Sequence, residues 1–416
     1  MGKNEKMEKG LNIRIPTNDC SKGKMDFLNY RNLSFLHFFI LSFFLLSCHH
    51  HHEPEPEPTD QTILYYFPWS GNAKGSAGLY SDFQNNIREI ENAITKRQTM
   101  ANARLLVCMA NKPYEAVLFE IKLDKGTTVR DTLATYSNVD FTKKETIRGF
   151  INDAKGYAPS LRYAMMIGCH GMGWLPVDDD ASAKTNLARR KYFGGDKGFR
   201  AEITTLADAI SESQTHLDFI LFDDCYMANV EVAYDLHRVA DHLIASTSEI
   251  MARGMPYEDI WQYLSPTPNY EEVCNAYHKF YSDYSYPYGT LAAIDCREVE
   301  AFAQLMAEAN ATHTFNEDDR EWLQALDGYT PPIFFDCGHY IDFLCFGDSE
   351  LLSPLTQQLQ RLVPFKVNTP SIFSTIDHPH TVAIDRFSGI TISDPSVNDK
   401  ADGKEHTAWW KATHKY

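Results

Sequence analysis

The sequence has little positive charge. Lys and Arg number 39 against 56 Asp and Glu, which gives the 416 residues a formal net charge of −17. A nucleic-acid-binding protein needs a basic face, so this balance argues against nucleic acid as a partner and predicts a solvated acidic surface. The sequence also lacks internal repeats, and no linker composition follows residue 60.

Close cysteine pairs are absent as well. Beyond Cys20 and Cys48 near the N-terminus, single cysteines stand at positions 108, 169, 225, 274, 296, 337 and 345. This spacing does not indicate a disulfide scaffold, and we expect most of these side chains to be small buried apolar groups. One reactive thiol among them would fit the odd count.

The apolar run at residues 32–47 is too short for a comfortable transmembrane helix. Because Lys and Arg precede it, it has the pattern of a signal peptide. It ends in Leu45-Leu46-Ser47-Cys48, which resembles the lipobox of bacterial lipoproteins, where the Cys becomes the lipidated first residue. An incidental Cys48 behind an ordinary signal peptide or anchor is the alternative. We predict a signal peptide and lead at 1–47, with Met25 as another candidate start, and a lipid-anchored location in the bacterial envelope, at the outer membrane or cell surface.

Residues 48–60 alternate Pro and Glu after four consecutive His, which predicts an extended flexible tether. Consecutive His in such a linker could bind a metal, but more often bind nothing specific, so we predict no metal site. The acidic cluster Asp178–Asp180 is too ordinary to indicate calcium.

Strands and helices alternate along residues 61–269, which predicts an α/β fold with a mostly parallel sheet covered on both sides. The apolar run Phe219–Phe222 reads as a strand buried on both faces. Other ranges read in the same way; strands are expected at 62–67, 104–109, 116–123, 163–169 and 242–246, and helices at 79–94, 147–154, 202–213 and 230–239. Thr142 and Glu145 form a capping-box pattern before one helix, and Gly156 is a candidate cap at its end. Residues 270–416 begin with a helical aromatic stripe and are expected to form a subdomain packed on the sheet.

Two of these strands end in chemically active side chains. Asp223, Asp224 and Cys225 follow one strand, and Cys169 and His170 follow another. Ligand crevices of open α/β sheets lie at the carboxyl ends of strands. A thiol there, close to a helix N-terminus, can have a lowered pKa, and a nearby imidazole can take its proton. The pattern suggests a Cys/His nucleophilic site; a core His beside incidental cysteines is the alternative.

Several segments together resemble the clostripain family of cysteine peptidases. His170-Gly171-Met172-Gly173-Trp174 resembles the family's histidine motif, and Asp223-Asp224-Cys225-Tyr226-Met227 resembles its nucleophile segment. Weaker likenesses are Ala245-Ser246 with Glu249, Gly254-Met255-Pro256-Tyr257, and Ser388–Ile392, so the resemblance spans roughly residues 62–395. It implies a caspase-like three-layer sandwich and an endopeptidase that favours Arg or Lys before the cleaved bond.

The resemblance also implies roles for individual residues. His170 and Cys225 would be the catalytic dyad, and the N–H groups of Gly171 and Cys225 would form the oxyanion hole. The loop 68–71 and Met255 depart from the family pattern, which leaves the substrate's shape open.

Asp223 calls for a separate explanation. Residues two apart share one face of a strand, so Asp223 should project near Cys225. A carboxylate beside the nucleophile would raise the thiol pKa, and it is better explained as the floor of a pocket for a cationic side chain; a structural Asp that binds loop amides is the alternative. Asp224 points the other way and is expected to be structural. Cys169, the rival nucleophile, diverges from His170 and is expected to be buried and inert.

The polar insertion at 178–200 is expected to be a long exposed loop. It contains Lys184, Arg189, Arg190 and Lys191, and an Arg/Lys-directed peptidase could cut its own chain after these residues. The alternative to self-cleavage is an ordinary solvated loop. The sequence therefore predicts a lipid-anchored cysteine endopeptidase that acts on proteins or peptides and needs no cofactor. A catalytically silent binding lipoprotein, or another thiol hydrolase such as an amidase or transpeptidase, remains the alternative.

Overall fold

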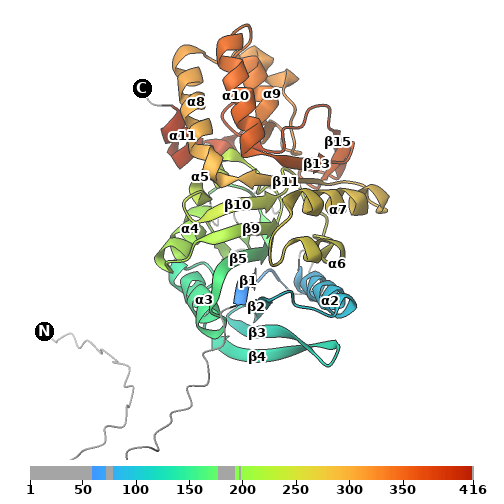
Figure 1. Ribbon diagram of the computed structural model, residues 1–416. Coiled ribbons are helices and arrows are strands. Elements are labelled where there is room, and N and C mark those ends of the chain that lie inside the picture. Colours follow the sequence, from blue (N-terminus) through green and yellow to red (C-terminus); the bar gives the residue numbers. More distant parts are fainter. Residues whose placement is uncertain (1–58, 72–77, 177–192, 196–197, 415–416) are drawn as a thin grey trace, which may run out of the picture. The chain divides into compact units, whose positions relative to one another are not determined.

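The computed structural model describes residues 59–71, 78–176, 193–195 and 198–414. A nine-stranded sheet runs through them in the order β13-β11-β10-β9-β5-β1-β2-β3-β4 (Figure 1). Its strands are β1 (Thr59–Phe67), β2 (Ala103–Lys112), β3 (Glu115–Asp124), β4 (Thr127–Ser137), β5 (Ser160–Gly168), β9 (Leu217–Asp223), β10 (Ala240–Ala245), β11 (Thr290–Asp295) and β13 (Phe365–Asn368). The five central strands are parallel, and antiparallel strands extend the sheet at both ends. The predicted α/β fold is confirmed.

Helices cover both faces of the sheet. On one face lie α3 (Lys144–Tyr157), α4 (Ile203–Glu212) and α5 (Val230–Leu236), and on the other lie α2 (Tyr80–Arg97), α6 (Tyr257–Ile260) and α7 (Tyr270–Asp283) (Figure 1). Strand β9 shows why both faces need a cover, because successive side chains point to opposite sides. Ile220 and Phe222 belong to one apolar cluster, and Phe219 and Leu221 belong to the other. The result is the expected three-layer sandwich.

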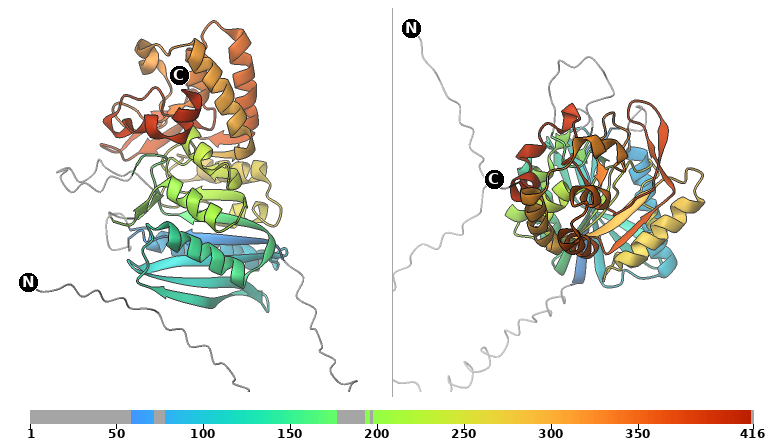
Figure 2. Two further views of the ribbon diagram at one scale, coloured as in Figure 1. Left: turned by 90° about the vertical axis from the view of Figure 1, so that its left-hand side faces the viewer. Right: turned by 90° about the horizontal axis from the view of Figure 1, so that it is seen from above.

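The C-terminal helices gather at the β13 end of the sheet (Figure 2). They are α8 (Val299–Thr312), α9 (Cys337–Leu344), α10 (Ser349–Leu362) and α11 (Ala408–Thr413). Strands β11 and β13 from this part of the chain enter the main sheet, and all described residues belong to one compact unit. A subdomain beginning at residue 270 stays a prediction. The short strands are β6 (His170–Gly171), β7 (Phe193–Gly194), β8 (Arg200–Ala201), β12 (Phe335–Asp336), β14 (Ser371–Ser374), β15 (His380–Ala383) and β16 (Thr391–Ile392).

The ends of α3 differ from the prediction. The helix begins at Lys144, and its N-cap residue, Lys143, makes no side-chain cap. The hydroxyl of Thr142 instead donates to Asp140 Oδ1 at 2.6 Å, so the predicted capping box is wrong. Gly156 lies inside the helix, because the chain stays helical to Tyr157 and is capped at Ala158.

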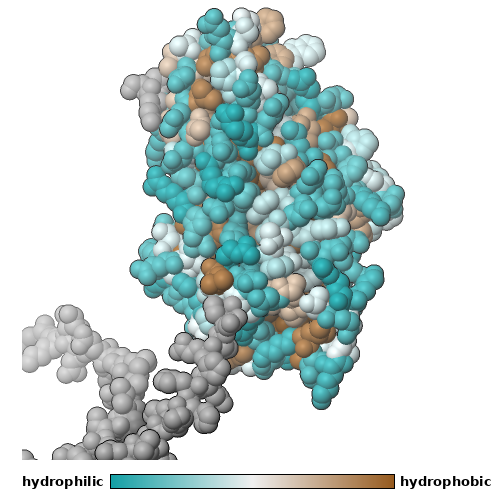
Figure 3. Space-filling model, in the orientation of Figure 1, coloured by the Kyte–Doolittle hydropathy of each residue, from teal (hydrophilic) through white to brown (hydrophobic). Residues whose placement is uncertain are grey.

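Most residues on the face drawn in Figure 3 are hydrophilic, with scattered apolar side chains between them. This agrees with the solvated surface that the charge balance predicts. Among the helices of the described ranges, none is long and apolar enough to cross a membrane.

Candidate active site

The ends of β5 and β9 bring His170 and Cys225 to one place. The two strands are parallel neighbours, and their register pairs Gly168 with Asp223. His170 and Cys225 each follow two residues later, so they leave the sheet side by side. Both line a single cavity of about 320 Å³, together with Gly171 and Asp223. The sequence prediction that these four residues meet at the carboxyl edge of the sheet agrees with this arrangement.

Glycine at position 171 allows the histidine strand to run against the nucleophile segment. A methyl group there would lie 2.5 Å from the carbonyl oxygen of Cys225, 2.7 Å from Cβ of Asp224 and 3.1 Å from the backbone nitrogen of Cys225. Real Cβ atoms essentially never approach other atoms as closely as 2.5 Å. The backbone of β6 is therefore held within van der Waals distance of Cys225.

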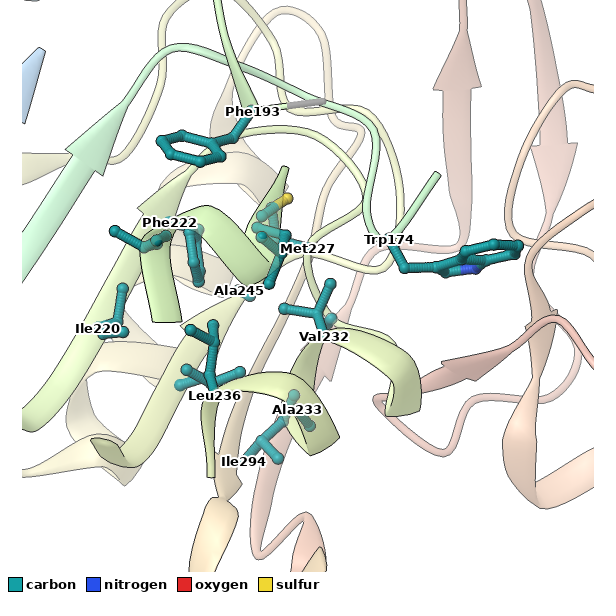
Figure 4. Packing of buried hydrophobic residues seen from close by; sticks show 14 of the residues in the cluster. Trp174, Phe193, Ile220, Phe222, Met227, Val232, Ala233, Leu236, Ala245 and Ile294 are labelled. Atoms are coloured by element: carbon teal, nitrogen blue, oxygen red, sulfur yellow. The ribbon is translucent and has the colours of Figure 1, made fainter. Parts of the chain in front are cut away.

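A small second sheet supports His170. Strand β6 pairs with β7, which pairs with β8, so that His170 faces Gly194 and Gly171 faces Phe193. Phe193 is 1% exposed and lies above Phe222 and Met227 in the core (Figure 4). The sequence predicts an exposed loop over all of 178–200. Phe193 and Gly194 are instead buried in β7, because the apolar ring packs into the core and anchors this end of the insertion.

Cys225 lies in a turn, not at a helix N-terminus. Helix α5 begins only at Val230 and is capped by Asn229, whose side chain accepts from the N–H of Val232. Tyr226, with a φ of 61°, turns the chain between strand and helix. The expectation that a helix terminus lowers the thiol pKa is therefore wrong.

The surroundings of the Cys225 thiol shift its pKa in both directions. Burial raises its pKa well above the ordinary value, and the charge of Glu249 adds to the rise. The backbone N–H of Ile250 donates to Sγ at 3.3 Å and acts in the opposite direction. We therefore expect the resting thiol to be protonated at neutral pH, so that attack needs a base to remove the proton.

Asp223 forms the floor of the cavity and is 6% exposed. Its carboxylate accepts hydrogen bonds from Asn86 Nδ2 at 3.1 Å, Tyr257 OH at 3.0 Å and the N–H of Met255 at 3.0 Å. Both sequence hypotheses thus describe part of its surroundings, since it binds a loop amide and also faces the cavity. Burial raises its pKa to about 6, which leaves the group ionised at neutral pH.

Cys169, the first residue after β5, and Asp224, the first residue after β9, bind one another, and both also line the cavity. The N–H of Cys169 donates to Asp224 Oδ1 at 2.7 Å, and its thiol lies 3.3 Å from Oδ2. Burial, followed by the charge of Asp224, raises the pKa of Cys169 well above its ordinary value. The prediction that Cys169 is buried is confirmed, and a structural role of Asp224 stays a prediction.

Sequence reasoning missed two further residues at the cavity floor. Asn86 comes from α2, and within the described part of the chain its Oδ1 is buried without a hydrogen-bond partner. Gly254, with a φ of 71°, leaves this floor uncovered, because a methyl group there would lie 2.7 Å from Asp223 Oδ2 and 2.9 Å from Asn86 Nδ2. The sequence carries no signal for Asn86, whereas Gly254 lies in the weaker family-like segment.

Several predicted sites fall outside the described residues. These are Cys48, residues 48–58 of the tether with its four His, and the four basic positions Lys184, Arg189, Arg190 and Lys191. The last two residues of the predicted tether, Thr59 and Asp60, instead begin β1. The seven cysteines that the structure does describe are all free; six of them are buried, as expected for most of them, and among the seven Cys225 alone is partly exposed. In the same residues, no cluster of three or more His, Cys, Asp or Glu side chains is arranged to hold a metal ion.

Comparisons with known proteins identify the family. The sequence pattern of the clostripain family, peptidase C11, matches residues 73–325, more than half of the chain. Among solved structures, a secreted C11 cysteine protease from Bacteroides thetaiotaomicron, "iotapain", is 44% identical, with a TM-score of 0.80, covering 86% of this chain and 100% of its own. A clostripain from Bacteroides thetaiotaomicron ATCC 29148, in complex with the peptide inhibitor BTN-VLTK-AOMK, is 49% identical, with a TM-score of 0.53, over 54% of this chain and 100% of its own.

A more distant structure agrees in fold alone. It is an inactive zymogen C11 protease from Parabacteroides distasonis, 24% identical, with a TM-score of 0.72, covering 87% of this chain and 100% of its own. Among curated proteins, none matches the chain significantly. With the family pattern over most of the sheet and a 44% identical relative over nearly all of the described fold, the chain belongs to the clostripain family and is a cysteine protease.

Proposed function

We propose that this cysteine protease is an endopeptidase that cleaves after Arg or Lys, with Cys225 as nucleophile and His170 as general base. The observation that carries the proposal is the shared cavity, which His170 and Cys225 line from adjacent strand ends above a buried carboxylate. A cationic side chain that reaches this floor would place its own backbone carbonyl near the cavity mouth, beside Cys225.

The reaction would proceed in two stages. His170 takes the proton of the Cys225 thiol as Sγ attacks the carbonyl carbon of the scissile bond. The N–H groups of Gly171 and Cys225 would bind the resulting oxyanion. The imidazolium then protonates the leaving amine, which leaves a thioester on Cys225. Water, deprotonated by His170, hydrolyses the thioester and restores the free thiol.

The floor of the cavity supports a preference for cations. An ionised carboxylate offers about four acceptor positions, and Asp223 uses three of them on Asn86, Met255 and Tyr257. The remaining position and the unpartnered Oδ1 of Asn86 are both acceptors. A Lys ammonium or an Arg guanidinium brings donors alone and matches such a floor. The inhibitor bound by the 49% identical clostripain carries the peptide VLTK, which ends in lysine.

Hydrolysis of fluorogenic peptides that end in Arg, Lys, Asp or Leu tests this proposal, with the Cys225→Ala and Cys169→Ala variants beside the unaltered chain. We expect cleavage after Arg or Lys that disappears in Cys225→Ala and persists in Cys169→Ala. Cleavage solely after Asp or Leu would refute the cation pocket and keep the nucleophile. Activity that survives Cys225→Ala would refute the nucleophile itself.

Two further proposals concern residues outside the described ranges. Cys48 would carry a lipid that anchors the protein to the bacterial envelope, and labelling of cells with a palmitate analogue should mark the chain but not its Cys48→Ala variant.

Active enzyme would cut its own chain after Lys184, Arg189, Arg190 or Lys191, because the enzyme is proposed to cleave after Lys and Arg. Intact mass after incubation should show fragments in the unaltered chain and none in Cys225→Ala; an active enzyme that stays whole refutes self-cleavage.

A further inference from the structure

A single carboxylate, that of Glu249, binds two segments that are far apart in the sequence. It follows β10 and is half-buried at the edge of the cavity. Its Oε1 accepts from Tyr226 OH at 3.0 Å, from Ser374 Oγ at 2.6 Å and from the N–H of Thr375 at 2.8 Å. Its Oε2 accepts from Thr375 Oγ1 at 2.7 Å. We call these four residues the Glu249 cluster.

On one side the cluster holds the nucleophile turn. The N–H of Tyr226 donates to the carbonyl of Ser248 at 3.0 Å, and the N–H of Ile250 donates to Cys225 Sγ at 3.3 Å. Residues on both sides of Glu249 are thus bound to Cys225 or to its neighbour. Tyr226 has a left-handed φ of 61°, a conformation that a non-glycine residue keeps only where its surroundings hold it.

On the other side the cluster holds one wall of the cavity. Ser374 is the last residue of β14, which pairs with β15 as a short hairpin. Thr375 and Ile376 come next and line the same cavity as Cys225 and Glu249. Thr375 is exposed, so its backbone would have few constraints without the carboxylate that takes both its N–H and its hydroxyl.

We propose that Glu249 is a positioning residue that couples the nucleophile turn to the substrate-facing wall at residues 374–376. A peptide that packs against Thr375 and Ile376 is then held in a fixed relation to Cys225 Sγ. Misplacement of reacting groups by about 1 Å can cost roughly 100-fold in rate, so such a coupling bears directly on catalysis. The four donors already present occupy the carboxylate, which argues against a role as the general base or as a second cation-binding group. The inference rests on Cys225 being the nucleophile.

The carboxylate charge has an opposing effect. Cys225 lines the cavity together with Asp223 at the end of β9, Asp224 directly after it, Glu249 from the segment after β10, and His170 from β6. After burial, Glu249 is the largest cause that raises the thiol pKa. A glutamine at 249 would keep an acceptor oxygen for the three donors of Oε1, could donate to the Thr375 hydroxyl, and would remove the charge. The variants Glu249→Gln and Glu249→Ala therefore separate geometry from charge.

The first experiment measures kcat and KM of the full chain and of both variants on a four-residue peptide substrate. We expect Glu249→Ala to lower kcat/KM by about tenfold or more, because hydrogen bonds to a charged group are lost. Glu249→Gln should stay within about threefold of the unaltered chain, and the pH midpoint for alkylation of Cys225 by iodoacetamide should move to lower pH. Glu271→Gln, at an exposed position in the first turn of α7, is the matched control for loss of a carboxylate.

Two results would overturn the inference. One is Glu249→Ala with unchanged kcat and KM; the other is Glu249→Gln as impaired as Glu249→Ala, which would mean that charge and not position matters. If Cys225→Ala itself stayed active, the proposed function would fail instead, so the two failures are distinguishable.

A second measurement keeps the test valid if Glu249→Ala folds poorly. Thr375→Val removes the exposed hydroxyl of the cluster and leaves the core untouched. In the unaltered chain and in the Glu249→Gln background, which keeps the hydrogen bond to Thr375, it should lower kcat/KM several-fold, whereas in the Glu249→Ala background, where that bond is already lost, it should have little further effect. Unchanged kcat/KM for Thr375→Val in the unaltered chain, or an undiminished effect of Thr375→Val in Glu249→Ala, would overturn the coupling.

Discussion

The substitution Gly171→Ala tests the close approach of the histidine strand to the nucleophile. The added methyl group would lie 2.5 Å from the Cys225 carbonyl oxygen, whereas ordinary contacts begin at 3.4 Å, so the two backbones must separate by about 0.9 Å. Forced overpacking of this kind costs about 1–3 kcal/mol of stability. A shift of about 1 Å between His170 and Cys225 costs roughly 100-fold in rate. We therefore expect a folded protein with a lower Tm and a kcat/KM reduced about 100-fold.

The chain offers a matched control for this prediction. Gly149 lies within α3, and a methyl group there meets no atom within 4 Å. Gly149→Ala should leave activity unchanged and stabilise the fold by about 0.5–1 kcal/mol, since alanine loses less backbone entropy in a helix. The assay is peptide hydrolysis well below each Tm, with thermal unfolding followed by circular dichroism. A Gly171→Ala variant with a kcat/KM within threefold of the unaltered chain would refute the argument from close approach.

The other predictions concern the pH dependence and the thiols. Asp223→Asn should lower kcat/KM on Arg and Lys peptides about 10- to 100-fold and leave kcat/KM on Leu peptides unaffected. In the unaltered chain, protonation of Asp223 below its pKa of about 6 should raise KM for the Arg and Lys peptides. A KM that is flat from pH 5 to 8 would contradict this role of the Asp223 charge. Burial raises the pKa of Glu231 to about 8, beside Asp394 with a pKa of about 7, so the folded state binds more protons than the unfolded one and stability falls as pH rises from about 4 to 8. Urea unfolding at pH 5 and 8 should show a smaller fall in Glu231→Gln, and an unchanged fall would exclude this carboxyl as a cause. Cys169→Ala should keep its activity within about threefold, with mass spectrometry still finding one iodoacetamide adduct, on Cys225.

The strands at the site could be predicted from the sequence because a buried strand is a continuous run of apolar residues. Phe219–Phe222 is apolar throughout, as a strand covered on both faces must be, and the polar residues after it mark the carboxyl end. Strand β4 was missed for the opposite reason, since Thr127–Ser137 is largely exposed and mixes polar and apolar residues without a clear period. The antiparallel direction of β11 could not be predicted, because apolar content carries no strand direction.

The candidate site divides in the same way. His170, Gly171, Asp223 and Cys225 stand at strand ends, where short-range patterns and the register of parallel strands determine their positions. Asn86 lies on a helix and Thr375 lies in the loop of the β14–β15 hairpin, and only the folded chain brings them to the cavity. Capping was mispredicted at Thr142 because Asp140, two residues earlier, offers a nearer acceptor.

The distribution of the thiols gives the fold a protective role towards oxidants. Before folding, an oxidant or a partner cysteine can reach every one of the seven described thiols, and mispaired products can form between any two. After folding, six are buried and Cys225 alone remains partly exposed. Oxidative damage to this protein should therefore depend on its timing: early exposure traps unfolded chains, and late exposure is confined to the Cys225 sulfur, whose sulfenic acid or disulfide a reductant can reverse.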